Sequence, residues 1–440
     1  MDLPDKLVDM NFELLHPRDQ IQLTMARIYG REMTTTSGGN ISVRDEDGNI
    51  WISPARVDKG SLTRRDIAKV SLDGEQLEGP HPPSSECPFH LSIYRARPDI
   101  KAIIHAHPSA LVSFSICGQV PDTRVFPEAW NVCGKVAFAP YALPGSQKLG
   151  DNIAAEFAKS DDTLCVVLEN HGVVVGGDAL SDVFKRFETL EFTAKTIIQA
   201  SNLGDFKTID DAGMSLAEAR LPDLPTAPGK APCSRERELR KEICDFMHRA
   251  YEHGLVTSTW GSLSARIDGN SFLITPYRVD RRSLDIEDLI VVRDGCCPPG
   301  TRPSRAVHLH AAIYAAHPEM NAVINALPVS ATAFSISKEV LDTRTIPESY
   351  LFLKDVPKIP FEDVLTAPEK VAQAMGPDNP VALLDHNGAF VAGKTVLDAF
   401  DRLEVLEATA EAIIQAKPLG AITPMQDEVI EELVSAFGRV

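Results

Sequence analysis

Two histidines lie two residues apart at the end of an apolar run in the first half of the chain. His105 and His107 follow Ile103 and Ile104 and precede a proline. If the apolar run is a β-strand, residues two apart point to the same face, so both imidazoles face one place. Such a pair can bind a metal ion such as Zn²⁺. The pattern is equally compatible with two unrelated histidines at a strand end.

A third histidine, His171, lies just beyond a second apolar run, Leu164 to Leu168, and is followed by Gly172. It could supply a third nitrogen to the same ion. Three protein ligands with one open position are the arrangement of a catalytic zinc site. Taken alone, a histidine at this place is more often a hydrogen-bonded residue at a strand end.

A carboxylate stands close before these histidines in the chain, in the segment Pro82–Glu86 (PPSSE). Beside a metal ion, Glu86 could act as the general base that removes a proton next to a carbonyl. The same segment is typical of a helix start, with a serine as N-cap and the glutamate in the first turn. The two interpretations are compatible, because helix N-termini and serine hydroxyls also bind anions.

Small residues and glycines form a further segment, Ser37–Ser42 (SGGNIS). Two glycines and short donors allow the backbone to approach an anionic group closely. The alternative is a tight turn between a helix and a strand.

The elements that must position these residues occur twice. Asp122–Arg124 recurs as Asp342–Arg344, and Ile197–Ala200 recurs as Ile413–Ala416. A repeat this long indicates a duplicated domain, since solenoid units are only about 20–50 residues long. A proline-rich stretch separates the copies. We therefore predict one domain over residues 1–220, a linker over 221–233 and a second domain over 234–440.

Strand and helix patterns alternate within each half. Helical patterns span Pro17 to Arg31 and Ser234 to His253, and Asp182 to Ala200 carries apolar residues at helical spacing. Apolar runs at Lys101 to Ile104 and Thr163 to Leu168 predict buried strands. This mixture predicts an α/β or α+β domain with a layered sheet.

In the order SGGNIS, PSSE, HAHP and NHG, the four segments resemble the class II aldolase/adducin family. The resemblance covers both copies and implies an α/β fold, a three-layer αβα domain with a mainly antiparallel central sheet, present twice. It implies His105, His107 and His171 as ligands of a divalent metal, with zinc expected and manganese or cobalt as alternatives. Glu86 would be the catalytic acid/base.

The resemblance also implies a substrate-binding set, and one departure from the family pattern adds to it. The family's sugar-phosphate aldolases usually carry Thr-Gly or Ser-Gly after the proline that ends a strand, whereas this chain has Ala55 and Arg56 there. A guanidinium binds phosphate or carboxylate bidentately. The alternative is that Arg56 only pairs with Asp58 at the surface. The predicted substrate-binding residues are Ser37, Gly39, Asn40, Arg56, Ser84 and Ser85.

The second copy has lost this chemistry. At the places of His105, His107, His171 and Glu86 it carries Asn325, Leu327, Asn387 and Ala306. Leucine cannot bind zinc, and asparagine is a poor ligand beside imidazole. We therefore predict a degenerate second domain without metal ligands. Residues lost as a set also suggest a set that functions together.

The predicted function is that of a metal-dependent, aldolase-type lyase. It would cleave or form a C–C bond in a small hydroxy-carbonyl compound, phosphorylated or carboxylated, through an enediolate. Alternatives are an epimerase or decarboxylase of the same family, a non-catalytic adducin-like interaction protein, and a metal-dependent regulator that binds a sugar acid.

Composition limits the partners. The chain has 44 lysines and arginines against 62 aspartates and glutamates, a formal net charge of −18, which argues against nucleic acid and anionic membranes. No secretory signal, spanning segment or CxxC pair is present among its 440 residues, so we expect a cytoplasmic protein with reduced thiols. The family resemblance implies a homo-oligomer, either a dimer forming a pseudo-four-fold ring or a larger assembly.

Overall fold

The computed structural model describes residues 12–219 and 221–437. The chain divides into two compact units. One contains the residues up to Arg124 together with Glu128–Lys195, and the other contains Val125–Pro127 and the residues from Thr196 onward. The domain limits at residues 220 and 234 remain a prediction. No helix among the described residues combines the length and apolar character needed to cross a membrane.

The first unit is built on an eight-stranded sheet in the order β4-β3-β2-β1-β5-β8-β7-β6, in which only the β6–β7 pair is parallel. Its strands are β1 (Asn40–Arg44), β2 (Ile50–Ile52), β3 (Ala68–Val70), β4 (Gln76–Glu78), β5 (Ala102–Ala106), β6 (Ala137–Ala139), β7 (Cys165–Leu168) and β8 (Gly172–Gly177). The central position of β5, between β1 and β8, places its residues deep inside the unit.

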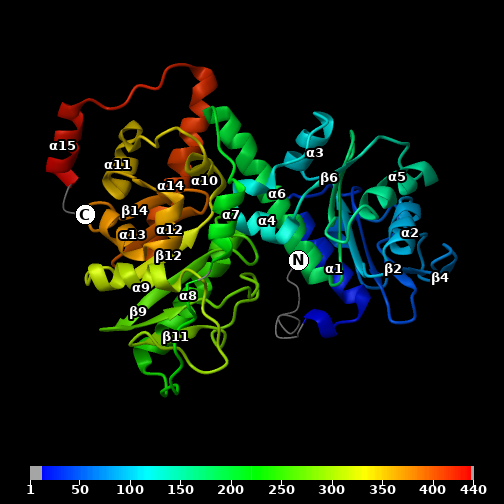
Figure 1. The fold of residues 1–440 in the computed structure, drawn as a ribbon, viewed down its shortest axis with the longest axis horizontal. Coiled ribbons are helices and arrows are strands. Elements are labelled where there is room, and N and C mark those ends of the chain that lie inside the picture. The colour runs from blue at the N-terminus through cyan, green and yellow to red at the C-terminus, as the bar shows by residue number, and fades with distance from the viewer. Residues whose placement is uncertain (1–11, 220, 438–440) are drawn as a thin grey trace. The chain divides into compact units, whose positions relative to one another are not determined.

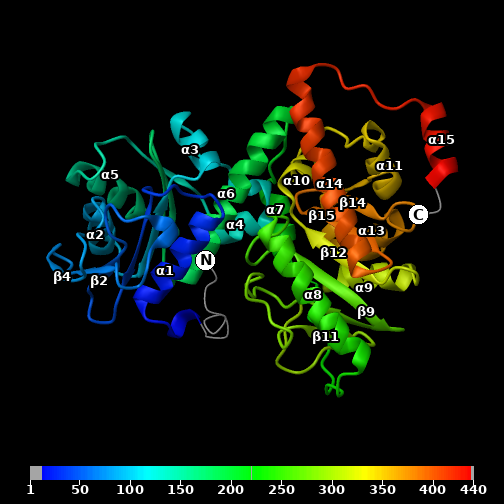
Figure 2. The same ribbon diagram turned by 180° about the vertical axis from the view of Figure 1, so that it is seen from behind.

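Helices cover both faces of this sheet (Figures 1 and 2). α2 and α5 pack on one face and form a core with the strand residues there, whereas α1 and α3 contact the other face. The helices are α1 (Pro17–Gly30), α2 (Cys87–Ala96), α3 (Ser109–Ile116), α4 (Pro127–Cys133), α5 (Gln147–Phe157) and α6 (Leu180–Leu203), of which α6 runs on into the second unit.

Among the residues that the structure describes, the second unit repeats this architecture without a counterpart of β4. Its sheet has the order β11-β10-β9-β12-β15-β14-β13, and only β13–β14 is parallel. The strands are β9 (Ser262–Asp268), β10 (Ser271–Ile274), β11 (Ile290–Arg293), β12 (Ala322–Ala326), β13 (Lys358–Ile359), β14 (Val381–Leu384) and β15 (Gly388–Gly393). The predicted α/β fold with a mainly antiparallel sheet, present twice, is confirmed.

Helices of the second unit cover its sheet in the same way. α9, α12 and α13 form a core with one face, and α8, α10 and α14 contact strands of the sheet as well. The helices are α7 (Asp211–Glu218), α8 (Ser234–Glu252), α9 (Val307–Ala316), α10 (Val329–Ile336), α11 (Pro347–Leu353), α12 (Phe361–Thr366), α13 (Pro368–Ala374), α14 (Val396–Ala416) and α15 (Asp427–Phe437).

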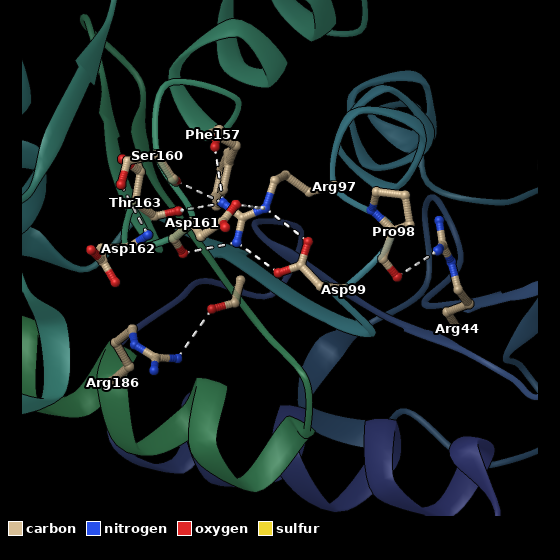
Figure 3. A network of polar contacts seen from close by, with 11 residues as sticks. Arg44, Arg97, Pro98, Asp99, Phe157, Ser160, Asp161, Asp162, Thr163 and Arg186 are labelled. Atoms are coloured by element: carbon tan, nitrogen blue, oxygen red, sulfur yellow. Dashed lines mark hydrogen bonds and ion pairs between the residues drawn. The ribbon is translucent and has the colours of Figure 1, made fainter.

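A buried arginine ties together the turns that lead into β5 and β7 (Figure 3). Arg97 follows α2 and forms two hydrogen bonds with the Asp99 carboxylate, at 2.8 and 2.7 Å. It also donates to the carbonyl oxygens of Phe157, Ser160 and Asp161 at 2.8–2.9 Å. The bond from Arg97 lowers the pKa of Asp99. The two histidine-bearing segments are therefore anchored at their far ends.

Replacing Arg97 with alanine is expected to lower the free energy of unfolding by about 3 kcal/mol, because the carbonyls and Asp99 lose a buried charged partner. Chemical denaturation checks this. Arg65→Ala is the control, since Arg65 is exposed, and it should change stability by at most about 0.5 kcal/mol. Equal losses in both variants would contradict the anchoring role of Arg97.

Candidate metal centre

His105 lies on β5 and points to the α2 face of the sheet. Its register partners are Asn40 on β1 and Val174 on β8, and the residue is 1% exposed. The His105 Nδ1 atom lies 2.9 Å from the Val173 carbonyl oxygen, which can only accept a hydrogen bond. Nδ1 therefore carries the proton, and Nε2 presents a lone pair, as a metal-binding histidine requires.

His107 and His171 converge on that lone pair. His107 follows β5, and His171 lies in the turn between β7 and β8. The Nε2 atoms of His105 and His107 are 3.0 Å apart, and a ligand atom from each of the three rings lies within 4.8 Å of the others. The three histidines singled out in the sequence therefore form one cluster that could bind a metal ion.

The turn that carries His171 is held by backbone geometry and by α3. Asn170 has a φ of +53°, a left-handed conformation that asparagine tolerates better than most residues. The His171 amide donates to the Ser115 hydroxyl at 2.9 Å, and that hydroxyl donates to the Leu168 carbonyl. The imidazole is thus aimed by a closed turn.

Gly172 leaves the space that His107 occupies. A Cβ atom added there would lie 2.6 Å from both the Ala106 carbonyl oxygen and His107 Cδ2. Gly172→Ala is therefore expected to displace the His107 ring and lower metal affinity by about 10-fold or more. Gly176→Ala is a control on the same strand, because its Cβ would meet Ile100 and Phe157 instead. Metal titration should separate the two variants, and equal affinities would contradict this view of Gly172.

Glu86 faces the histidine cluster from the start of α2. Its Oε2 lies 3.2 Å from His105 Nε2, and its Oε1 lies 3.2 Å from His171 Nε2. The helix begins where the sequence predicts, but Glu86 and not a serine stands at the N-cap, and its side chain makes no capping bond. The reason is that the carboxylate turns toward the histidines instead of the helix backbone.

The electrostatics suit a cation. Burial by itself would raise the pKa of Glu86, but the neighbouring rings of His105 and His171 lower that pKa overall. Burial and the neighbouring imidazoles lower the pKa of His107 to about 3, so its ring is neutral at neutral pH. A carboxylate stays ionised beside a neutral imidazole.

The donor set fits a divalent metal. Glu86 Oε1 is buried and has no hydrogen-bond partner, and the Nε2 atoms of His105 and His107 face each other. Imidazole nitrogens are ligands that suit zinc and related ions, and the Glu86 carboxylate places a negative charge beside them. Among residues 12–219 and 221–437, these three histidines are the one group of histidine, cysteine and acidic side chains close enough to hold an ion.

The glycine segment packs directly against the cluster. A Cβ at Gly38 would lie 3.2 Å from His107 Nδ1, and one at Gly39, whose φ is +71°, would lie 2.8 Å from the His105 carbonyl oxygen. Ser37 is exposed, and Asn40 is buried at the first position of β1. The segment therefore forms a turn that packs against the histidine cluster, and its predicted contact with an anionic group stays a prediction.

The remaining predicted substrate residues lie on two adjacent segments. Pro54 and Pro83 form an isolated bridge, and the Ser84 amide donates to the Ser53 carbonyl at 3.2 Å. Arg56 follows Pro54 in an exposed position, while Ser84 is buried and Ser85 exposed.

The structure gives Arg56 no ion pair with Asp58. The Asp58 carboxylate accepts instead from the Gly60 amide and the Ser61 hydroxyl, both at 2.9 Å. The alternative of a surface pair is therefore not observed.

Sequence reasoning missed two buried polar residues near the glycine segment. The Thr34 hydroxyl is buried without a hydrogen-bond partner, 3.0 Å from where a Cβ at Gly39 would lie. Lys59 donates from Nζ to the Pro54 carbonyl at 2.8 Å, and burial lowers its pKa to about 8. The sequence does not indicate that either residue is buried, because a single threonine or lysine among polar residues is normally expected at the surface.

The corresponding place in the second unit holds no such cluster. Asn325 donates to the Ala389 carbonyl at 3.2 Å, and Leu327 is fully buried. His386 has a φ of +54° like its counterpart Asn170, and its Nδ1 lies 2.8 Å from the Val125 carbonyl oxygen. The scaffold is retained without the ligands.

The match to a known protein family covers both copies of the repeat. The family model described as the Class II Aldolase and Adducin N-terminal domain matches residues 19–198 and 241–414. A 3-oxo-tetronate 4-phosphate decarboxylase of Pectobacterium atrosepticum is 38% identical over 195 residues, covering 42% of this chain and 86% of that protein. An L-fuculose phosphate aldolase of Methanocaldococcus jannaschii is 38% identical over 169 residues, covering 38% and 88%. The L-fuculose-1-phosphate aldolase structure from Thermus thermophilus is 27% identical, covers 43% of this chain and 98% of that one, and has a TM-score of 0.38.

Proposed function

The chain belongs to the class II aldolase and adducin family, and on this premise we propose that its first half is a metal-dependent carbon–carbon lyase. The observation that carries the proposal is the convergence of His105, His107, His171 and Glu86 in one copy, against their joint replacement in the other. The substrate would be a small hydroxy-carbonyl compound that bears a phosphate or a carboxylate.

His105, His107 and His171 would hold the ion, with zinc expected and manganese or cobalt as alternatives. When bound, a divalent ion polarises a ketone and its neighbouring hydroxyl and stabilises the negative charge that develops as the C–C bond breaks. The Nδ1–H group of His105 donates a hydrogen bond to the Val173 carbonyl oxygen. This bond fixes the ring orientation and keeps Nε2 available.

Glu86 would act as the acid/base that transfers a proton within the substrate during the reaction. In the cleavage direction its carboxylate removes the proton of the hydroxyl beside the breaking bond, and the electron pair of that bond passes to the carbonyl, leaving an enediolate and an aldehyde. The same carboxyl group then returns the proton to carbon. The free, buried Oε1 atom supports this role, because a base needs a lone pair that is not already engaged.

The anionic group of the substrate would bind where the glycine segment meets the Arg56 and Ser84–Ser85 segments. Close backbone approach at Gly38 and Gly39, and the unpartnered Thr34 hydroxyl beneath them, support this placement. Arg56 adds a guanidinium at the rim. A cytoplasmic homo-oligomer, either a dimer forming a pseudo-four-fold ring or a larger assembly, completes the proposal.

The test is turnover by the metal-loaded chain. We expect L-fuculose 1-phosphate or a related ketose phosphate to be cleaved to an aldehyde and a three-carbon ketone phosphate, and the activity to vanish on chelation. Release of CO₂ from 3-oxo-tetronate 4-phosphate would instead favour the decarboxylase alternative. The adducin-like alternative would be supported if neither compound reacts and dihydroxyacetone phosphate exchanges no proton with D₂O.

A further inference from the structure

A buried chain of side-chain hydrogen bonds ends on Glu86. The Tyr94 hydroxyl lies 2.7 Å from Ser42 Oγ, which lies 2.7 Å from His90 Nδ1. His90 Nε2 bonds Asn40 Oδ1, and Asn40 Nδ2 donates to Glu86 Oε2 at 2.9 Å. Each member is at most 9% exposed. This row of hydrogen bonds extends from the core of the first unit to the candidate metal centre.

Two elements supply the first four members. Asn40 and Ser42 alternate along β1 and so point to one face, and His90 and Tyr94 are four residues apart on α2. α2 is also the helix that Glu86 precedes. The hydrogen bonds thus connect β1 to α2, the helix that positions the reactive carboxylate.

The chemistry of the side chains determines which atom donates in each of these hydrogen bonds. A carboxylate only accepts, so Asn40 must present its NH₂ group to Glu86 and its carbonyl to His90. His90 must then carry its proton on Nε2, and its Nδ1 must accept from the Ser42 hydroxyl. Burial lowers the pKa of His90 to about 3, which is consistent with a neutral ring. Ser42 in turn accepts from Tyr94.

The second unit provides an internal comparison. His310, Ser264 and Tyr314 repeat the core of the chain, with Ser264 Oγ 2.6 Å from His310 Nδ1 and 2.7 Å from the Tyr314 hydroxyl. Ser262 replaces Asn40 and lies 3.0 Å from His310 Nε2, and Ala306 replaces Glu86. The His–Ser–Tyr part therefore exists without a carboxylate, whereas the asparagine occurs where a carboxylate must be held.

We propose that Asn40, fixed by His90, is a positioning residue that makes the two oxygens of Glu86 unequal. Oε2 accepts from the Asn40 amide and lies 3.2 Å from His105 Nε2, whereas Oε1 has no hydrogen-bond partner and lies 3.2 Å from His171 Nε2. The Asn40 bond opposes rotation of the carboxylate out of this orientation, so one oxygen stays anchored and the other keeps its lone pairs unengaged. This inference rests on the proposed function for its kinetic consequence, and it replaces the substrate-binding role predicted for the Asn40 side chain.

The first test needs no substrate. In ¹⁵N-histidine-labelled full-length protein, long-range ¹H–¹⁵N spectra should show His90 as the Nε2–H tautomer, with the signal assigned by its loss in His90→Asn. His310 is under no such constraint, because a serine hydroxyl can donate or accept. An Nδ1–H or charged His90 would overturn the proposal.

The second test uses four variants of the full chain. Asn40→Ser installs the second unit's residue, which can bond His90 but cannot reach Glu86. His90→Asn removes the Nε2 donor, whereas His90→Gln places an amide N–H near that position. His310→Asn removes the equivalent buried contacts in the second unit. His90→Asn and His310→Asn should lower the melting temperature by similar amounts.

The variants should differ in kcat. With L-fuculose 1-phosphate as probe and metal content equal to wild type, we expect Asn40→Ser and His90→Asn to lower kcat by about 10–100-fold with KM changed by less than about 3-fold. His90→Gln should recover most of that loss, and His310→Asn should stay within about 2-fold of wild type. Equal losses in His90→Asn and His310→Asn, or wild-type kcat in Asn40→Ser, would overturn the proposal.

The two tests keep the inference separate from the proposed function. An inactive wild-type protein in which His90 is the Nε2–H tautomer would contradict the proposed function alone. An active wild type with the opposite tautomer would contradict the positioning role alone.

Discussion

Replacing Glu86 with glutamine is expected to lower kcat about 1,000-fold while the protein keeps its fold and its metal. Glutamine has nearly the same shape, and its carbonyl oxygen can still accept from Asn40. It cannot take a proton at neutral pH, so the step assigned to the carboxylate fails. The three histidines remain, which is why metal content should be retained. Steady-state turnover and metal analysis of the same preparation measure both effects.

A carboxylate close to the site but outside the cluster is the control. Glu169 lies two residues before His171, and its Oε2 accepts from the Tyr141 amide at 2.8 Å. Glu169→Gln should leave kcat within about 3-fold of wild type. If both variants lose activity equally, or if Glu86→Gln remains active, Glu86 is not the base.

Replacing His107 with alanine is expected to weaken metal binding by about 100- to 1,000-fold. Four-ligand zinc sites are worth about 10–16 kcal/mol, or about 2.5–4 kcal/mol for each ligand, and each 1.4 kcal/mol is a factor of ten. Competition titration with a chelator of known affinity measures the change. Activity should fall in parallel, since the chemistry depends on the bound ion.

The control for this variant lies in the second unit. His386 is 5% exposed and sits in the turn equivalent to that of His171. His386→Ala should leave the metal affinity unchanged, even if it lowers stability. A loss of metal in His386→Ala, or its retention in His107→Ala, would place the ion elsewhere.

Several features could be predicted from the sequence because they follow from local periodicity. The alternation of residues in β5 places His105 on one face, and the run before His171 becomes β7 (Cys165–Leu168). The comparison of the two copies also separated scaffold from chemistry, since Leu327 and Ala306 have no ligand atoms.

The contacts that complete the site depend on packing between distant segments, and no local pattern encodes them. Asn40 and Glu86 meet only because β1 pairs with β5 and α2 packs on the same sheet. Burial of Thr34 and Lys59 likewise depends on packing: Thr34 lies beside Gly39, and Lys59 donates to the carbonyls of Pro54 and Thr36. The recurrence of His90 and Tyr94 as His310 and Tyr314 was available as a signal, but it indicates a shared core and not a link to catalysis.

The most direct measurement is the anomalous scattering of crystals of the metal-loaded full-length protein. We expect one divalent ion per chain, bonded to the Nε2 atoms of His105, His107 and His171 at about 2.0–2.1 Å. A second ion in the other unit, an ion at any other place, or no ion at a saturating metal concentration would contradict it.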